Sequence, residues 1–278
     1  MKNILTLSIS LFISMTVRAQ QAVPTLPASR HQLVIIAHRG NHVDVPENSV
    51  AAIEETIRCG ADYAELDLRT TKDGQFVLMH DASVDRMTNG KGKVADLTLA
   101  EIKQLKLNSK DGKEYHVPTF KEALLACKGR LNIYLDFKDA DVETTWKLLK
   151  ETGTDQQVVV YLNAKEQYKA WRKTAPEMPL MASLPDEVTT PEQMDNFLQH
   201  VKIAVLDNIS DKAMLEVARK HNTAIWLDVQ KATEGPDDWS AALNKGVQGL
   251  QSDHPGALVN YLNEHHLRGG MEAKAEHK

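Results

Sequence analysis

The stretch DYAELDLRTTKDGQFVLMH, residues 62–80, holds two apolar runs separated by a short polar segment. The runs span 62–68 and 75–80, and TTKDG at 70–74 lies between them. A parallel crossover needs roughly a dozen residues or more, so these two runs can pair only as antiparallel neighbours. The Asp-Gly dipeptide in the connection is typical of hairpin turns. The stretch therefore predicts a β-hairpin.

Seven further apolar, β-rich runs occur along the chain, and helical patterns lie between most of them. Strands that alternate with helices predict a parallel sheet covered by helices. With the second hairpin run set aside, eight strands remain, the number in a (β/α)8 barrel. We therefore predict an α/β fold, a (β/α)8 TIM barrel. The seven runs are 33–38, 131–138, 157–161, 179–184, 203–207, 224–229 and 248–252.

Helix boundaries are marked by capping residues. Ser49 is expected to begin a helix that buries Val50, Ile53 and Ile57 and ends at Gly60. Thr-Leu-Ala-Glu at 98–101 and Thr-Phe-Lys-Glu at 119–122 have the pattern of capping boxes. Further helices are predicted at 142–151, 164–173, 190–200, 211–220, 237–245 and 255–265.

The first 19 residues have the pattern of a secretory signal peptide, with Lys2, an apolar stretch at 4–15 and Ala19 at the expected cleavage point. The apolar stretch is shorter than the roughly 20 residues of a membrane span. An uncleaved N-terminal anchor is the alternative. We expect export, to the periplasm or the medium, without stable membrane insertion.

The rest of the chain fits one domain. Residues 31–267 are predicted to form a single barrel, with a small insertion at 86–118 after the second strand and a flexible tail at 268–278. The formal net charge is −5, which argues against a nucleic-acid partner. Cys59 and Cys127 could pair in an exported protein, but two cysteines do not make a disulfide scaffold. The sequence leaves their state open.

Acidic side chains lie on the polar faces of two predicted strands. Since side chains alternate across a strand, Glu65 and Asp67 share one face, and Asp136 and Lys138 share one face of the 131–138 run. Burying unpaired carboxylates costs several kcal/mol, and neighbouring carboxylates also repel one another. A divalent cation removes both penalties, and oxygen ligands suit Mg²⁺ or Ca²⁺ rather than zinc. We predict that the three acids hold such a cation.

The alternative is structural ion pairing of Glu65 and Asp67 with Arg69 or Lys138. Glu-x-Asp and Asp-x-Lys are each weak signals when taken alone. Their occurrence together, inside a barrel pattern and between two histidine motifs, favours the metal site.

Two histidines end strands. His38 ends the first run, and His80, followed by Asp81, ends the hairpin run. Catalytic groups of such barrels lie at the carboxyl ends of strands. Imidazole titrates near neutral pH, so His38 and His80 can share the roles of general acid and general base. We expect the other histidines on the surface or in loops: His31, His42, His116, His200, His221, His254, His265, His266 and His277.

Positive charge accompanies these groups. The guanidinium of Arg39 offers planar donors that match phosphate oxygens, and Lys138 adds a second cation. Gly40 lets the backbone come close to a ligand. Together these residues predict an anionic substrate.

Pro46, Glu47 and Asn48 follow in the same loop. Pro46 is expected to start the next helix. Glu47 and Asn48 either orient His38 or Arg39 from behind, or belong only to the helix start. The sequence does not decide between these two readings.

From 33 to 262 the chain resembles the glycerophosphodiester phosphodiesterase family. The resemblance rests on an ordered set of short motifs, each of which is common by itself. They are His38-Arg39-Gly40, Pro46-Glu47-Asn48-Ser49, Glu65-Leu66-Asp67, His80-Asp81, DRMTNGKGKVADLT at 85–98, Asp136-Phe137-Lys138 and Ser252-Asp253-His254-Pro255.

The resemblance implies a (β/α)8 barrel, a divalent metal on the three acids, acid–base roles for His38 and His80, and phosphate contacts from Arg39 and Lys138. The third ligand is more often glutamate in this family, and here it is Asp136. The resemblance also implies that Trp226 lines the alcohol pocket. Asp228, two residues later, is an unusual carboxylate for the family.

The predicted function is metal-dependent hydrolysis of glycerophosphodiesters to glycerol phosphate and an alcohol, and the resemblance favours His80 as the acid. A phospholipase that acts on intact lipid is one alternative. It would need an apolar rim, and aromatic residues make up only 5% of the chain. A non-catalytic, metal-dependent phosphodiester binder is the other, but binding alone needs neither histidine.

Overall fold

The computed structural model describes residues 22–269. The predicted signal peptide at 1–19 and residues 270–278 of the predicted tail lie outside this range. The strands are β1 (Val34–Ala37), β2 (Tyr63–Thr70), β3 (Phe76–Leu78), β4 (Asn132–Phe137), β5 (Val158–Leu162), β6 (Leu180–Ala182), β7 (Val205–Asp207), β8 (Ala224–Asp228) and β9 (Gly249–Ser252).

The α-helices are α1 (Val50–Cys59), α2 (Leu99–Ile102), α3 (Phe120–Cys127), α4 (Val142–Thr152), α5 (Lys165–Thr174), α6 (Pro191–His200), α7 (Lys212–Lys220), α8 (Pro236–Leu243) and α9 (Pro255–Glu264). Short 3₁₀ turns lie at Val94–Asp96 and Asp155–Gln157.

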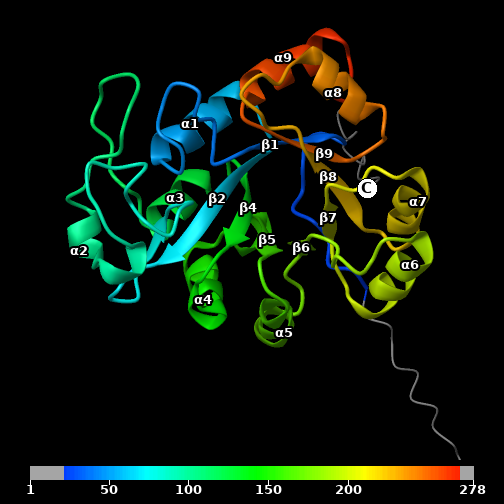
Figure 1. Cartoon of the computed structure of the whole chain (residues 1–278), viewed down its shortest axis with the longest axis horizontal. Helices are drawn as coiled ribbons and strands as arrows, with labels where there is room; N and C mark the ends of the chain where they lie inside the picture. The colour runs from blue at the N-terminus through cyan, green and yellow to red at the C-terminus, as the bar shows by residue number, and fades with distance from the viewer. Residues whose placement is uncertain (1–21, 270–278) are drawn as a thin grey trace, which may run out of the picture.

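Eight of the strands close into a barrel. The hydrogen-bonded order is β1-β9-β8-β7-β6-β5-β4-β2, all parallel, and β1 also pairs with β2. Ile36 on β1 is in register with Tyr63 on one side and with Gln251 on the other. Helices surround the ring of strands (Figure 1). The predicted (β/α)8 barrel is therefore confirmed.

The ninth strand is the predicted hairpin partner. β3 pairs antiparallel with β2, with Arg69 opposite Val77. The turn is closed by the amide of Thr71, which donates to the Gln75 carbonyl at 2.8 Å. Gly74 adopts a φ of 73°, a conformation that glycine takes without strain. The short connection thus excludes β3 from the barrel, as expected.

Two apolar layers follow from side-chain alternation. The outer layer lies between strands and helices and includes Leu66, Leu135 and Leu250. The inner layer fills the barrel and consists of Val34, Ile36, Tyr63, Tyr134, Val159, Met181, Ala204, Val205 and Trp226. Val23 and Leu26 of the N-terminal segment pack against this inner layer.

The N-terminal segment is fixed at the amino end of the barrel strands. The Tyr63 hydroxyl donates to the Pro27 carbonyl at 3.4 Å, and the Asn132 amide donates to the Ala28 carbonyl at 2.8 Å. Tyr63 and Asn132 begin their strands, so this segment covers the amino end of the barrel. The carboxyl ends of the strands, on the opposite side, remain available for a site.

Helix ends agree with the predicted caps, with one exception. Ser49 caps α1, Gly60 ends it with a φ of 79°, and Thr98 and Thr119 both form capping boxes. Pro46 does not start α1 as expected. It lies in the preceding loop, where its carbonyl accepts a 2.6 Å hydrogen bond from the Ser49 hydroxyl. The proline shapes the entry to the cap rather than the helix itself.

The predicted insertion at 86–118 shares a small core with β3 and the residues that follow it. Val77, Met79, Val84, Val94, Ile102, Leu107 and Val117 form a cluster separate from the two barrel layers. The predicted tail at 268–278 begins too early. The Arg268 guanidinium donates to Asp62 at 2.8 Å, and the Gly269 carbonyl accepts from the Gln32 amide at 3.1 Å.

Two further features concern export and membranes. Cys59 and Cys127 are both free thiols in the structure. Among residues 22–269, none of the helices combines the length and the apolar character that a bilayer crossing requires.

The contact between Gly249 and Trp226 gives a test of the inner layer. A Cβ atom at Gly249 would lie 2.4 Å from Trp226 Cδ1, and the indole is only 2% exposed. We expect Gly249→Ala to lower the free energy of unfolding by about 1–3 kcal/mol in urea denaturation. Gly256→Ala is the control, because its Cβ would meet an ordinary contact at 3.4 Å. Equal stability of both variants would contradict the described packing.

Candidate active site

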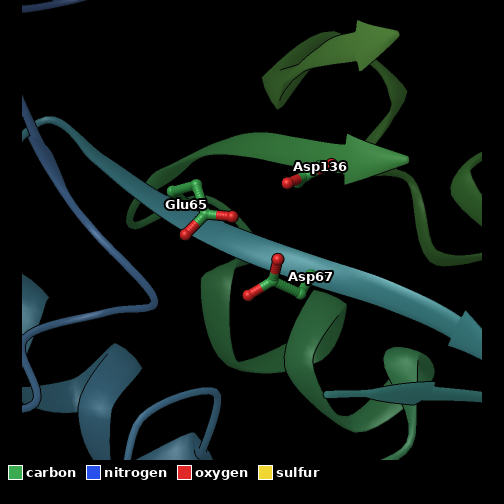
Figure 2. A group of neighbouring side chains, drawn as sticks. All are labelled: Glu65, Asp67 and Asp136. Carbon is green, nitrogen blue, oxygen red and sulfur yellow. The ribbon is translucent and has the colours of Figure 1, made fainter. Parts of the chain in front are cut away.

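Three carboxylates converge inside the carboxyl end of the barrel (Figure 2). Glu65 and Asp67 lie on β2, and Asp136 lies on β4 directly in register with Asp67. One oxygen from each lies within 4.8 Å of the others. The alternation read from the sequence is confirmed, since Leu66 and Leu135 pack in the outer layer on the opposite faces.

Burial makes this cluster electrostatically costly. Asp67 is fully buried and Glu65 is 3% exposed. Burial and the charges of Asp67 and Asp136 raise the pKa of Glu65 well above its usual range. Burial and the charge of Asp67 also raise the pKa of Asp136. A positive charge placed among the three groups would relieve this repulsion.

Lys138 supplies part of that charge. Its Nζ lies 3.1 Å from Asp67 Oδ1 and also contacts Asp136. Arg69, the other cation weighed as a partner, instead binds Asp139 at 2.8 Å and the His80 carbonyl. The Arg39 guanidinium adds a longer contact, with Nε 3.9 Å from Asp67 Oδ2. Ion pairing therefore accounts for part of the cluster, but two cations face three carboxylates.

The residues present fit a divalent cation. Glu65 has no side-chain cation within 4 Å among the described residues. Asp67 Oδ1 is buried. Lys138 Nζ is near it, but no donor among residues 22–269 meets the geometry of a hydrogen bond to this atom. An all-oxygen donor set with excess negative charge is the environment that Mg²⁺ and Ca²⁺ prefer.

The His38-Arg39-Gly40 turn brings a backbone donor to the cluster. The Arg39 amide donates to Glu65 Oε2 at 2.7 Å. Arg39 and Gly40 have φ values of 54° and 75°, so the chain makes a left-handed bend here. A Cβ atom at Gly40 would lie 2.7 Å from that of Ala52, which explains why glycine is required.

The loop after β1 also supports the acids. Glu47 accepts from Arg39 Nη1 at 3.2 Å, which is the contact expected if Glu47 orients Arg39. The Asn48 side chain bonds to neither His38 nor Arg39, but its backbone amide donates to the Arg39 carbonyl at 2.9 Å. Its Nδ2 donates to Asp67 Oδ2 at 2.6 Å, and its Oδ1 accepts from the Asp67 amide at 3.0 Å. Asn48 thus fixes a carboxylate of the cluster.

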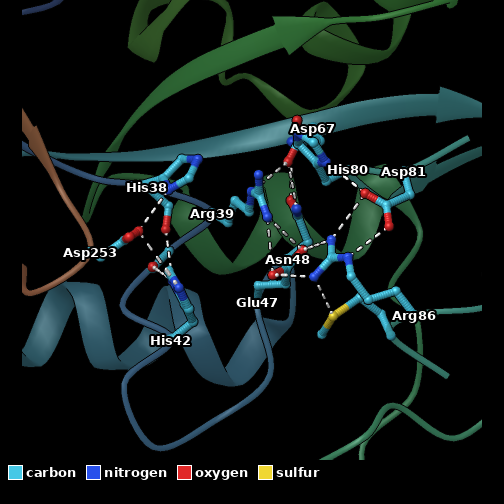
Figure 3. Close-up of polar contacts among 12 residues, drawn as sticks. His38, Arg39, His42, Glu47, Asn48, Asp67, His80, Asp81, Arg86 and Asp253 are labelled. Atoms are coloured by element: carbon cyan, nitrogen blue, oxygen red, sulfur yellow. Dashed lines mark hydrogen bonds and ion pairs between the residues drawn. The ribbon is translucent and has the colours of Figure 1, made fainter. Parts of the chain in front are cut away.

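The His38 ring is held by a carboxylate from the far end of the chain. Nδ1 of His38 lies 2.7 Å from Asp253 Oδ1, just beyond β9 (Figure 3). His42 Nε2 lies 3.7 Å from the same oxygen. The hydrogen bond from His38, with the charges of His42 and Arg39, lowers the pKa of Asp253. Asp253 was expected only as part of the Ser252-Asp253-His254-Pro255 motif, although its place after a strand run could have indicated a role in the site.

The His80 ring is held in the same way. Nδ1 of His80 lies 2.8 Å from Asp81 Oδ1. Arg86, from the insertion, donates to Asp81 Oδ2 at 2.7 Å and to Glu47 Oε1 at 2.7 Å. Hydrogen bonds to Glu47 and Asp81 raise the pKa of Arg86, and Arg86 in turn lowers the pKa of Asp81.

Arg86 thereby connects two motifs that are distant in sequence. Through Asp81 it supports His80, and through Glu47 it supports Arg39, as the dashed lines in Figure 3 show. Burial raises the pKa of Glu47, but the hydrogen bonds and charges of Arg86 and Arg39 outweigh this effect and lower the pKa below its usual value. Sequence reasoning did not assign Arg86, and no local pattern indicated which way its side chain would point.

Trp226 lies deeper than expected for a residue that lines a pocket. It packs against Tyr63 with ring centroids 5.1 Å apart and against Tyr134 at 6.2 Å. Only 2% of its surface is exposed, which leaves little of the indole for a ligand to contact. Trp226 belongs to the layer beneath the barrel mouth.

Comparison with known proteins identifies the family. The model of the "Glycerophosphoryl diester phosphodiesterase family" matches residues 38–257. A glycerophosphodiester phosphodiesterase of Caldanaerobacter subterraneus subsp. tengcongensis is 29% identical over 244 residues, which cover 83% of this chain and 98% of that protein.

Solved structures agree in fold. The crystal structure of a glycerophosphodiester phosphodiesterase from Agrobacterium tumefaciens matches with a TM-score of 0.71 and 25% identity, over 82% of this chain and 99% of that one. An Oleispira antarctica phosphodiesterase, in complex with the product sn-glycerol-3-phosphate, matches with a TM-score of 0.73 and 21% identity, over 83% and 96%. The family model spans most of the sequence, and the chain belongs to the glycerophosphoryl diester phosphodiesterase family, a family of phosphoric diester hydrolases.

Proposed function

We propose that this enzyme hydrolyses glycerophosphodiesters to glycerol phosphate and an alcohol with a divalent cation, Mg²⁺ or Ca²⁺, on Glu65, Asp67 and Asp136. The observation that carries the proposal is the convergence of these buried carboxylates beside two carboxylate-held histidines. When bound, the cation would polarise the phosphoryl oxygens and lower the pKa of the attacking oxygen.

The histidines supply the proton transfers in this proposal. A carboxylate at Nδ1 selects the ring form with its proton on that nitrogen, so Nε2 is left to exchange protons with substrate. We assign proton removal to His38 and protonation of the departing alcohol to His80. The His80 side chain is 37% exposed, against 17% for His38. The greater exposure of His80 suits the ring that protonates the departing alcohol.

Arg39 is suited to bind the phosphate. Its Nε is buried and lies 3.9 Å from Asp67 Oδ2, too far for a hydrogen bond, and it has no hydrogen-bond partner among residues 22–269. A phosphoryl oxygen would satisfy this donor and gain a charge-assisted hydrogen bond. Burial lowers the pKa of Lys138, but Asp67 and Asp136 more than reverse this, so Lys138 stays charged and contributes mainly to the cluster.

The structure favours small phosphodiesters over intact lipid. The exposed large hydrophobic side chains of the described residues are Val43, Val50, Leu125 and Leu267, none of which is aromatic. This is a poor basis for an apolar rim that would dock on a lipid surface. We also propose export to the periplasm or the medium, on the N-terminal sequence pattern, and cell fractionation with an antibody tests it.

Cation binding can be measured without turnover. We expect isothermal titration calorimetry to detect one Mg²⁺ or Ca²⁺ per chain, with roughly tenfold or more weaker binding in Asp67→Asn, because a charged ligand is lost. Asp44→Asn, an exposed acid in the loop after β1, is the control. Unchanged cation affinity in Asp67→Asn would rule out the assigned ligand set.

The histidine assignment predicts a loss of rate without a loss of metal. We expect His38→Ala and His80→Ala each to lower kcat by about 10²–10⁴ on glycerophosphodiesters, with cation affinity retained. His116→Ala, an exposed histidine of the insertion, should keep full activity. Near-wild-type turnover in either active-site variant would remove that histidine from the mechanism.

Arg86 is proposed as a positioning residue, acting through Asp81 and Glu47. We expect Arg86→Ala to lower kcat roughly tenfold, as removal of an orienting partner usually does, with unchanged cation affinity. Arg86→Lys should restore only part of the rate. The ammonium keeps the positive charge, but it lacks the forked donors that reach both carboxylates. If Arg86→Ala only lowers the free energy of unfolding and leaves kcat intact, the residue is structural.

A further inference from the structure

A second group of polar side chains occupies the barrel mouth across from the metal cluster. Tyr161, Ser183, Asp207 and Asp228 come from the carboxyl ends of β5 to β8. Each follows an inner-layer residue by two positions: Val159, Met181, Val205 and Trp226. Because side chains alternate along a strand, all four face the barrel axis.

A hydrogen-bonded chain fixes this group. Tyr161 Oη lies 2.7 Å from Ser183 Oγ, and the Ser183 hydroxyl donates to Asp207 Oδ2 at 3.0 Å. The Asn208 amide donates to Asp228 Oδ2 at 2.8 Å, and Asn208 Oδ1 accepts from the Asp228 amide at 3.0 Å. These partners orient both carboxylates but bring no positive charge.

The two carboxylates therefore lack counter-charge. No side-chain cation lies within 4 Å of Asp207 or Asp228 among residues 22–269. Lys231, which lines the same cavity as Asp228, is held by Asp238 at 2.7 Å. Burial raises the pKa of Asp207, and the charge of Asp228 adds to this, so a cation would be favourable here.

A separate observation indicates a missing ligand. Gln251 on β9 is 6% exposed, and its Oε1 is buried without a hydrogen-bond partner in the described part of the chain. Leu250 packs in the outer layer, so Gln251 faces the axis, and it is in register with Asp228. A buried amide oxygen without a donor is costly unless a ligand provides one.

We propose that Asp207, Asp228 and Gln251 form a subsite for an ammonium group on the alcohol arm of the substrate, with the phosphate at the metal cluster. The inference rests on the proposed function and adds the class of substrate, a glycerophosphodiester of an amino alcohol. Tyr134 connects the two clusters. It is in register with Glu65 on β2, and its ring packs against that of Tyr161 with centroids 5.8 Å apart.

The acceptors favour a primary ammonium over a quaternary one. A primary ammonium has three N–H donors, and the subsite offers two carboxylates and one amide oxygen. A quaternary ammonium is bound mainly by the faces of several aromatic rings. This group contains one ring, Tyr161, which is partly exposed. A neutral polyol would bring no positive charge to Asp207, which is partly buried, or to Asp228, which is exposed.

The test compares three soluble substrates: glycerophosphoethanolamine, glycerophosphocholine and glycerophosphoglycerol. We expect wild-type kcat/KM to be about tenfold higher for the ethanolamine ester than for the glycerol ester, from one partly screened charge pair. Asp207→Asn and Asp228→Asn should each reduce that ratio by at least about threefold, because kcat/KM falls more for the ethanolamine ester than for the glycerol ester. Asp186→Asn, an exposed acid in the loop after β6, is the charge-matched control.

Binding in the His80→Ala background separates the two proposals. There we expect calorimetry to show the same preference for the ethanolamine ester, and its loss on adding Asp228→Asn. If none of the three esters is hydrolysed but this binding preference exists, the proposed reaction fails and the subsite stands. A wild-type ratio near one, or equal losses on all three substrates in both Asp→Asn variants, overturns the subsite.

Discussion

The architecture of this site follows from one electrostatic constraint, the burial of Glu65, Asp67 and Asp136 on two neighbouring parallel strands. Asp67 and Asp136 are in direct register, so the barrel itself holds their charges together. Lys138 offsets part of the repulsion, and backbone and amide donors from Arg39 and Asn48 fix the oxygens. Such a cluster is favourable in a folded protein when a cation completes it.

The remaining groups of the site are arranged around that cluster in carboxylate-linked pairs. Asp253 holds His38 and Asp81 holds His80, so both rings are oriented by a negative charge. Arg86 ties Asp81 to Glu47, and Glu47 holds Arg39. The insertion after β3 is therefore part of the site, since it contributes the guanidinium that links the two histidine motifs.

The fold was predictable because its signals are local or periodic. The six residues between the two runs forced the hairpin, and strand alternation placed each of the three acids on the polar face of its strand. The pairing of His38 with Asp253 joins residues 215 positions apart and depends on closure of the barrel by β9. No sequence period encodes such a contact, nor the direction of the Arg86 side chain.

The errors have similar causes. Pro46 is a common first residue of a helix, but Ser49 made the stronger cap and moved the start. The family resemblance implied that Trp226 lines the alcohol pocket. Its position two residues before the end of β8 leaves 2% of its surface exposed. Arg268 is buried against Asp62, a tertiary contact that composition alone does not show.

The direct measurement of the cation site is anomalous diffraction from crystals grown with Mn²⁺, a redox-stable substitute for Mg²⁺ or Ca²⁺ at an oxygen site. The result expected is a single strong peak bonded to oxygens of Glu65, Asp67 and Asp136, with the Lys138 ammonium moved to the edge of the cluster. An absence of density among these carboxylates at saturating Mn²⁺, with Lys138 still between Asp67 and Asp136, would contradict it.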